Sequence, residues 1–205
     1  TRTEIFRQTL LQGREALRQR YYCSGNGAAL LRDHSRLLDD ILRRAWRAIA
    51  MPDSIALLAV GGYGRQQLFP FSDIDLLVLL PAEGQGYAAA ADGAIKVLLE
   101  QWVRLLWDIG LEIGHSVRTI AHCTEEAMKD ITVQTSLLEA RQLTGHRQLF
   151  NEFVNTMKAR LKPGLFFQAK QREQEQRHGR YHDATHNLEP NIKESPGGLR
   201  DLQNV

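Results

Sequence analysis

The chain has 205 residues, of which 43% are hydrophobic and 24% are charged, a balance that excludes a disordered or fibrous protein and predicts a globular fold with a real core. Its 26 Lys and Arg residues nearly balance 24 Asp and Glu residues, so the net charge of +2 does not indicate a nucleic-acid-binding or membrane-binding surface. We therefore expect neither a nucleic acid nor a membrane among its partners.

The cysteines and the first segment of the chain bear on its location. Cys23 and Cys123 lie far apart and outside any metal-ligand or redox spacing, which fits a reducing compartment. No apolar stretch approaches the length of a membrane span, and the N-terminal segment is amphipathic, so no signal peptide is predicted. We expect a cytoplasmic protein. The chain begins at Thr1 rather than at methionine, and we expect it to be a piece of a longer protein.

The apolar pattern predicts two N-terminal helices, a buried strand that ends at glycines, a second strand, a helix and a third strand. From Thr124 onward helical patterns dominate, with breaks near Gly145 and Pro163. The predicted helices cover residues 5–20, 28–50 and 88–107, and the predicted strands cover residues 54–60, 73–80 and 111–119. The first two strands are apolar enough to be central. The expected fold class is α+β, with a small mixed sheet over about residues 51–120 flanked by helices on both sides in the sequence.

Two alternate carboxylates open the second predicted strand. Side chains alternate across a strand, so Asp73 and Asp75 project from the same face while Ile74 points into the core. Two carboxylates this close repel each other unless a cation lies between them. Mg²⁺ fits, because it accepts carboxylate oxygens and completes its shell with water and phosphate oxygens. The pair therefore predicts a metal site that also holds a phosphate ligand.

A glycine-rich turn just upstream supplies the other half of such a site. Gly61 and Gly62 lie where strand meets helix, and without side chains they let backbone N–H groups approach phosphate oxygens. Arg65 would add a charged hydrogen bond, and Ser72 would either bond a phosphate or end the preceding turn. Each element alone is common in ordinary turns. The order of strand, glycine pair, helix start, Ser-Asp-x-Asp and apolar strand is what indicates a nucleotide site.

This order resembles the nucleotidyltransferase fold of DNA polymerase beta and its relatives, and further motifs are similar to the bacterial PII uridylyltransferase/uridylyl-removing enzyme family. These motifs are GGYGR at 61–65, Leu68, Pro70, SDIDLL at 72–77, GLEIGHSVRT at 110–119 and NLEPNIKESPGGLRDL at 187–202. The resemblance implies transfer of UMP from UTP to a tyrosine of the nitrogen regulatory protein PII, with release of pyrophosphate. It also implies Mg²⁺ or Mn²⁺, held by Asp73 and Asp75.

The resemblance further implies a third carboxylate and a domain division. Relatives of this fold use a carboxylate from a neighbouring strand, for which Glu112 is the best candidate and Asp108 the second. A solvated or salt-bridged side chain is the alternative for Glu112. The expected parts are N-terminal helices (1–50), a nucleotidyltransferase core (51–145), and a helical segment that begins a truncated helical domain (146–205). The family's uridylyl-removing and glutamine-sensing domains are expected to be absent.

The polar segment 187–202 admits two interpretations. It either folds back over the nucleotide, so that Lys193 or Arg200 reaches triphosphate oxygens, or it is an interdomain brace held by local ion pairs. The activity has alternatives too. A nucleotidyltransferase of the same fold could act on another acceptor, and a regulatory module could bind nucleotide without catalysis. No motif shows which base is selected.

The histidines are a weaker signal. His178, His182 and His186 recur at a spacing of four and could place three imidazoles on one helix face as metal ligands. The surrounding sequence is so polar that we interpret this face as solvated. His182 and Asp183 spell the dipeptide of metal-dependent phosphohydrolases, but the additional ligands of such a site are not evident. His115, on a strand with alternating apolar residues, is expected to be a packed core histidine.

Overall fold

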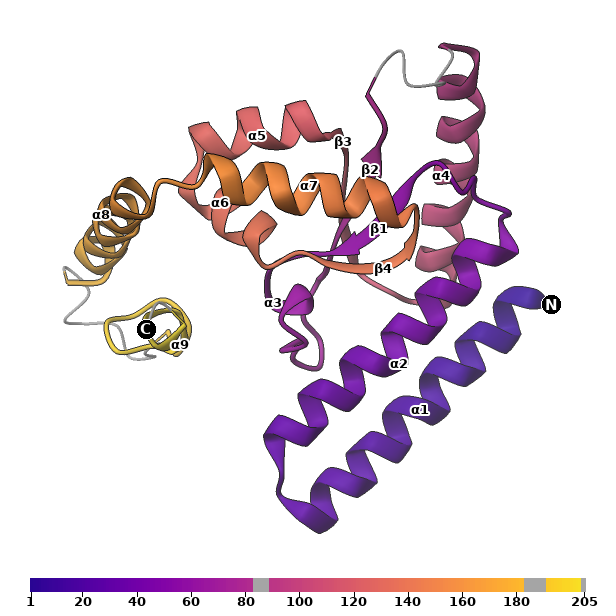
Figure 1. The fold of residues 1–205 in the computed structure, drawn as a ribbon. Coiled ribbons are helices and arrows are strands. Elements are labelled where there is room, and N and C mark those ends of the chain that lie inside the picture. The colour runs from indigo at the N-terminus through magenta and orange to yellow at the C-terminus, as the bar shows by residue number, and fades with distance from the viewer. Residues whose placement is uncertain (83–88, 183–190, 204–205) are drawn as a thin grey trace.

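Figure 1 shows the fold in a computed structural model, which describes residues 1–82, 89–182 and 191–203. The helices are α1 (Arg2–Ser24), α2 (Gly27–Ala48), α3 (Gly61–Gly64), α4 (Ala89–Ile109), α5 (Ile120–Lys129), α6 (Ile131–Leu138), α7 (Arg147–Arg160), α8 (Pro163–His182) and α9 (Leu199–Leu202). The strands are β1 (Ala56–Ala59), β2 (Ile74–Leu80), β3 (Ile113–Thr119) and β4 (Arg141–Gly145). Within the described residues, no helix is both long enough and apolar enough to span a membrane.

The four strands form one mixed sheet in the order β3-β2-β1-β4. β1 pairs antiparallel with both β2 and β4, whereas β2 pairs parallel with β3. The connection from β2 to β3 contains the crossover helix α4. The α+β class is confirmed, and so is the prediction that the first two strands are central. The pairing of Ile74 with Ile113 places Asp75 opposite Gly114, which matters for the site described below.

β4 lies in the part of the chain after Thr124, where helical patterns dominate and no strand is predicted. Its sequence, Arg-Gln-Leu-Thr-Gly, contains a single large apolar residue, Leu143, so no strand period is visible in it. Its position depends on contacts with distant residues. Gly145 has φ +91, and a Cβ atom there would lie 2.2 Å from the Ile55 carbonyl oxygen, so β4 can end beside β1 only with a glycine at this position.

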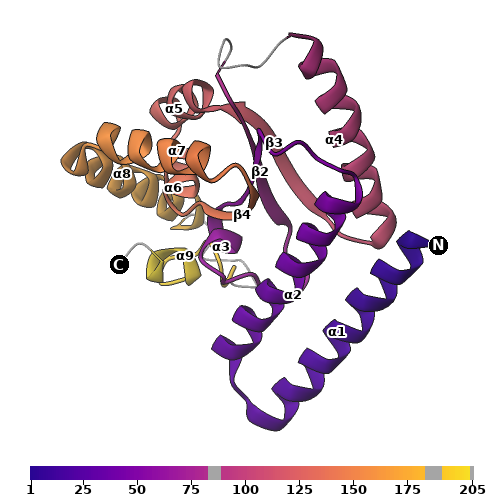
Figure 2. The ribbon, with the colours of Figure 1, turned by 45° about the vertical axis from the view of Figure 1, so that its right-hand side comes forward.

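Helices cover both faces of the sheet (Figures 1 and 2). The side chain of Ile74 points to the core under α1, α2 and α4, where Trp46 and Trp102 meet edge to face with ring centroids 5.3 Å apart. The side chain of Leu77 points to the second core, under α5, α6 and α7. Because residues alternate along β2, Asp75 lies on the same side of the sheet as Leu77.

The two cysteines differ in their surroundings, and we expect them to differ in reactivity. Cys23 is exposed on α1, whereas Cys123 is fully buried in the second core. Burial raises the pKa of the Cys123 thiol to about 12, so almost no reactive thiolate is present at neutral pH. Titration with a thiol reagent should therefore modify one cysteine in the native protein and both after denaturation. Equal reaction rates of the two in the native protein would contradict this packing.

Candidate functional site

A cavity of about 540 Å³, here called the Asp75 cavity, lies where β1 ends and β2 begins. Its walls come from α3, the loop after α3, α6, α8 and the segment 191–203, which includes α9. Every site residue predicted from the sequence lines this cavity except Glu112. These residues are Gly61, Gly62, Arg65, Ser72, Asp73, Asp75, Lys193 and Arg200. The fold thus brings the glycine turn and the carboxylate pair together with cations from the far end of the chain.

The glycine turn is held in a conformation that requires glycine. Gly61 has φ +57, and a Cβ atom there would lie 3.3 Å from Ser136 Oγ and 3.8 Å from Asp75 Oδ2, inside the cavity. A Cβ atom on Gly64 would lie 2.2 Å from the Glu139 carbonyl oxygen, so α3 packs directly against the end of α6. Because neither glycine has a side chain, the backbone of the turn is accessible from the cavity at Gly61 and packs tightly against the end of α6 at Gly64.

The carboxylate pair, Asp73 and Asp75, lies at the N-terminal end of β2. Asp75 keeps an exposed surface, yet partial burial in the cavity raises its pKa, the charge of Asp73 raises it further, and Lys193 opposes both effects. On the neighbouring strand a Cβ atom at Gly114 would lie 2.9 Å from Asp75 Oδ1, so a glycine opposite Asp75 leaves room for its carboxylate. Two acidic groups with one facing cation form a site that would gain from a bound cation.

Arg65 is already paired in this structure. Its Nη1 lies 2.5 Å from Glu139 Oε1, and its Nε donates to Gln67 Oε1 at 3.0 Å. An anionic ligand in the cavity would compete with Glu139 for this guanidinium. Glu139 lies at the end of α6 and was missed by the sequence analysis, because nothing in the local sequence connects it with a turn more than seventy residues upstream.

Three hydroxyl groups of α6 also line the Asp75 cavity and were missed. Thr132, Thr135 and Ser136 are three and four residues apart, which places them on one helix face. That spacing was a signal the sequence did contain. Asp130 caps the helix by accepting from the backbone N–H groups of Thr132 and Val133, which fixes the direction of this face.

Glu112 lies outside the Asp75 cavity. It lines a second cavity of about 570 Å³, here called the Glu112 cavity, which also includes Asp73, Trp107 and Gly114. The negative charge of Glu112 acts on the nearby guanidinium of Arg14 and partly offsets the lowering of its pKa by burial. Asp108 lines neither cavity, and its carbonyl accepts a hydrogen bond from Arg7. Among the described residues no three His, Cys, Asp or Glu side chains are grouped to hold a metal ion.

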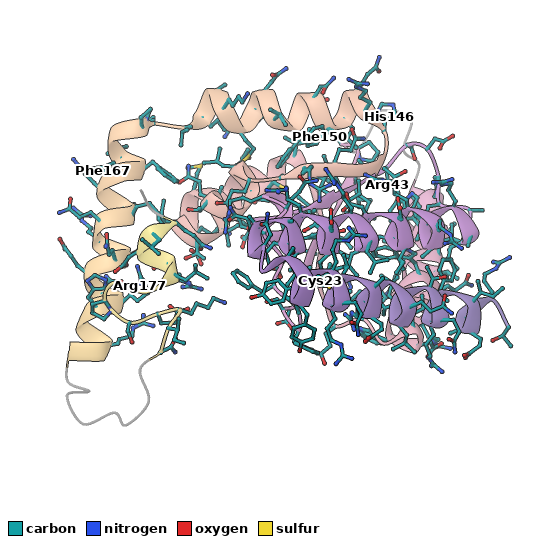
Figure 3. All side chains as sticks on the ribbon, turned by 90° about the horizontal axis from the view of Figure 1, so that it is seen from below. Cys23, Arg43, His146, Phe150, Phe167 and Arg177 are labelled. Atoms are coloured by element: carbon teal, nitrogen blue, oxygen red, sulfur yellow. The ribbon has the colours of Figure 1, made fainter. Side chains whose placement is uncertain are left out.

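The segment 191–203 is held against α8 by Arg177 of that helix (Figure 3). The side chain of Arg177 is buried, with 4% of its surface exposed. Its Nη2 lies 2.7 Å from Asp201 Oδ1, its Nη1 donates to the Glu194 carbonyl at 3.1 Å, and its Nε lies 3.3 Å from Glu173 Oε1. Burial would raise the pKa of Asp201, but hydrogen bonds from Arg177, the Gly197 N–H and His178 hold it at about 2. Asp201 is therefore ionised at neutral pH.

Both interpretations of the segment 187–202 find support in the residues described. Lys193 and Arg200 line the Asp75 cavity, and an ion pair between Arg200 and Glu194, with 3.0 Å between Nε and Oε1, braces the segment locally. Residues 187–190 lie outside the described residues.

Two histidine interpretations are wrong. His178 is not simply solvated, because its Nε2 hydrogen-bonds with Asp201 Oδ2 at 2.8 Å; α9 returns to α8 at this point, which helical spacing alone could not reveal. His115 is exposed rather than packed in the core, because β3 is an edge strand and α4 does not cover it. The side chains of His182 and His186 lie outside the described residues.

Comparison with known proteins gives consistent matches over the chain. Residues 37–138 match the family model described as a nucleotidyltransferase domain, and residues 165–205 match the one described as GlnD PII-uridylyltransferase. A crystal structure of a toxin-antitoxin with AMP-PNP matches with a TM-score of 0.34 and 15% identity, covering 71% of this chain and 96% of that one. At that score the likeness carries no inference about function.

The curated relatives are much closer. A bifunctional uridylyltransferase/uridylyl-removing enzyme of Nitrosospira multiformis is 65% identical over 98% of this chain, and one of Aromatoleum aromaticum is 51% identical over 96%. The chain spans 23% and 22% of the lengths of these two proteins. On these matches, the chain belongs to the family of bifunctional uridylyltransferase/uridylyl-removing enzymes and contains their nucleotidyltransferase domain.

Proposed function

We propose that the protein transfers UMP from UTP to a tyrosine of the nitrogen regulatory protein PII and releases pyrophosphate. The observation that carries this proposal is the Asp75 cavity, in which two carboxylates, an open glycine turn and facing cations share one space. Such a cavity suits a triphosphate, because the reaction needs charge neutralisation and positioning more than covalent chemistry from the protein. The descriptions of the matched family model and of the relatives support uridylyl as the transferred group.

The residues of the cavity divide the work by their chemistry. Backbone N–H groups at Gly61 and Gly62 would bind phosphate oxygens, with the Ser72 hydroxyl beside them. Lys193, Arg200 and Arg65 would balance the negative charge of the triphosphate, the last by leaving Glu139. The acceptor hydroxyl would be oriented beside Asp73, which lines both the Asp75 cavity and the Glu112 cavity.

Mg²⁺ or Mn²⁺ fits the carboxylate pair, because burial and the charge of Asp73 together raise the pKa of Asp75, and a bound cation would relieve the repulsion between the two carboxylates. Asp73 and Asp75 would hold it, and Glu112 is our candidate for a third ligand ahead of Asp108, since it lines a cavity together with Asp73. When bound, the cation supplies neutralisation of the triphosphate and a lower pKa for the attacking hydroxyl.

We also propose the division into N-terminal helices (1–50), a nucleotidyltransferase core (51–145) and a helical segment (146–205). The end of β4 at Gly145 supports the second boundary. A cytoplasmic location remains a proposal that rests on the two cysteines, which the structure describes as free.

The test is incubation of the chain with Mg²⁺, labelled UTP and purified PII, with ATP, CTP and GTP in parallel. Label on PII from UTP alone, with pyrophosphate release, is the expected result. Label on a different acceptor would indicate a nucleotidyltransferase of the same fold with another substrate. UTP binding by calorimetry without any transfer in the presence of PII would favour a non-catalytic nucleotide-binding module.

Arg177→Met is expected to raise the KM for UTP by roughly tenfold or more, because loss of charged hydrogen bonds worth about 1.5–3 kcal/mol releases the segment that carries Lys193. Arg177→Lys should recover part of the loss. Arg180→Met, three residues along the same helix at an exposed position, is the matched control and should leave the KM unchanged. Equal KM values in Arg177→Met and the control would show that this anchor does not position the nucleotide.

A further inference from the structure

A groove of about 710 Å³ runs between α4 and β3, on the opposite face of the sheet from Asp75. We call it the α4 groove. Its walls are mainly apolar, with Leu99 and Val103 on the helix and Val117 on the strand. Val117 is 41% exposed, and Trp107, near the C-terminal end of α4, is 60% exposed. Apolar surface gathered in a groove in this way is typical of a binding surface.

The groove connects with the carboxylate pair. Trp107 lines both the α4 groove and the Glu112 cavity, and Asp73 lines both the Glu112 cavity and the Asp75 cavity. The three spaces therefore follow one another around the start of β3. A ligand seated in the groove could extend past Trp107 and place a side chain beside Asp73, while the nucleotide occupies the Asp75 cavity from the other side.

β3 itself offers a template for an extended chain. It lies at the edge of the sheet, and among the described strands only β2 pairs with it. Backbone N–H and C=O groups on its other edge are thus placed to pair with an added strand, whose alternate side chains would enter the groove beside it. His115 and Val117, on the α4 side of β3, are both exposed, and side chains of such a strand on the same side would pack against them.

We propose that the acceptor protein binds as an extended segment along the free edge of β3, with side chains in the α4 groove and its reacting hydroxyl beside Asp73. This inference rests on the proposed function, since it gives the binding surface for the acceptor of that reaction. An aromatic hydroxyl suits the path, because a tyrosine ring can pack against Trp107 while its oxygen reaches the carboxylates of Asp73 and Glu112 in the Glu112 cavity.

The continuity of the groove with Asp73 favours the acceptor over two other occupants. A second copy of the chain, or a segment of a longer protein of the kind represented by the relatives, could cover the apolar walls. Neither would explain why the groove shares Trp107 with the cavity that contains Asp73, the carboxylate that also lines the nucleotide cavity. An extended acceptor must reach that carboxylate, and the groove and the edge strand both lead there.

The test compares Val117→Glu with Val97→Glu. Val117 lies on the groove wall, whereas Val97 is 52% exposed on α4 and does not line the groove, so each change adds a charge at an already exposed valine. Val117→Glu should raise the KM for PII at least about tenfold, because a docked segment would remove the new carboxylate from water against the apolar walls of the groove. The Kd for UTP, measured by calorimetry, should stay within about twofold of wild type. Val97→Glu should change neither value.

Hydrogen exchange of the β3 amides with and without saturating PII gives a readout that does not depend on transfer. Slower exchange in β3 is expected on binding, and Val117→Glu should abolish it. Equal KM values for PII in the two variants, no protection of β3, or a shift of the chain from dimer to monomer with Val117→Glu would overturn the inference. Protection of β3 without any labelling of PII would instead support the groove and count against the proposed reaction.

Discussion

Asp75→Asn is expected to lower the rate of UMP transfer by at least about a thousandfold, and Asp73→Asn is expected to do the same. Each change removes a carboxylate from the Asp75 cavity while keeping the size of the side chain. Loss of one ligand weakens the hold on a cation that contributes several kcal/mol to transition-state stabilisation, and each 1.36 kcal/mol corresponds to a factor of ten in rate. The measurement is single-turnover transfer of label from UTP to PII.

Asp75→Asn is expected to leave the free energy of unfolding unchanged or higher in metal-free buffer. Burial and the Asp73 charge raise the pKa of Asp75 in the folded state, so folding favours the protonated form. A group of this kind contributes stability below its unfolded pKa of about 3.9, and that contribution is lost as the pH rises through the higher folded pKa. At pH 7 the ionised carboxylate therefore destabilises the fold. The Tm difference between Asp75→Asn and wild type, measured in EDTA, should shrink below about pH 4.

Asp53→Asn is the matched control, because Asp53 is an exposed aspartate before β1, at the opposite end of that strand from the site. It should retain wild-type transfer and pH dependence. Mg²⁺ and UTP together should raise the Tm of wild type and of Asp53→Asn, but not that of Asp75→Asn. Near-wild-type turnover by either carboxylate variant would contradict the site assignment.

The parts of the fold that could be predicted are those whose secondary structure is encoded by a pattern in the neighbouring sequence. The N-terminal helices have an apolar face at helical spacing, and the buried runs before the glycine turn and after Asp73 read as strands because both faces are covered by helices. β4 could not be predicted, because it is short, mostly polar and placed by Arg141 and Gly145 through contacts with distant residues. The exposure of His115 likewise depends on which strand lies at the sheet edge.

The candidate site divides in the same way. The glycines and carboxylates between Gly61 and Asp75 are close in sequence, and their order alone predicts a nucleotide site. The partner of Arg65, the hydroxyls of α6 and the anchoring of Lys193 by Arg177 all depend on tertiary contacts. The direction of Glu112 could not be fixed from alternation, because the turn at Gly110, with φ +92, precedes it and β3 begins only after it.

Arg141→Met is expected to lower the free energy of unfolding by about 3–5 kcal/mol, a large share of the roughly 5–15 kcal/mol of a typical domain. Arg141 is the bidentate partner of Asp39, which is 3% exposed, with distances of 2.7 Å from Nη1 to Oδ2 and 3.0 Å from Nη2 to Oδ1. The Tyr63 hydroxyl donates to the same carboxylate at 2.7 Å. Removing the guanidinium would leave a buried carboxylate without its main counter-charge.

This network also holds the glycine turn. Arg141 donates from Nε to the Gly64 carbonyl at 3.2 Å and from Nη2 to the Tyr63 carbonyl at 3.3 Å, so it ties β4 to α3 directly behind the Asp75 cavity. Arg141→Met is therefore expected to raise the KM for UTP as well, at temperatures where the variant is still folded. Urea denaturation and UTP titration of the same sample separate the effect on stability from the effect on binding.

Arg43→Met tests whether the buried ion pair between Arg141 and Asp39 is what stabilises the fold. Arg43 contacts the same Asp39 carboxylate through one longer approach of 3.4 Å from a side chain that is 33% exposed, and its Nε donates to the Leu143 carbonyl at 2.8 Å. Its loss should therefore cost roughly 1–2 kcal/mol, less than the loss of Arg141. In an Asp39→Asn background there is no buried charge to compensate, and Arg141→Met should cost much less than it does in wild type. A loss that is the same in both backgrounds would mean that Arg141 stabilises the fold through its carbonyl contacts rather than through Asp39.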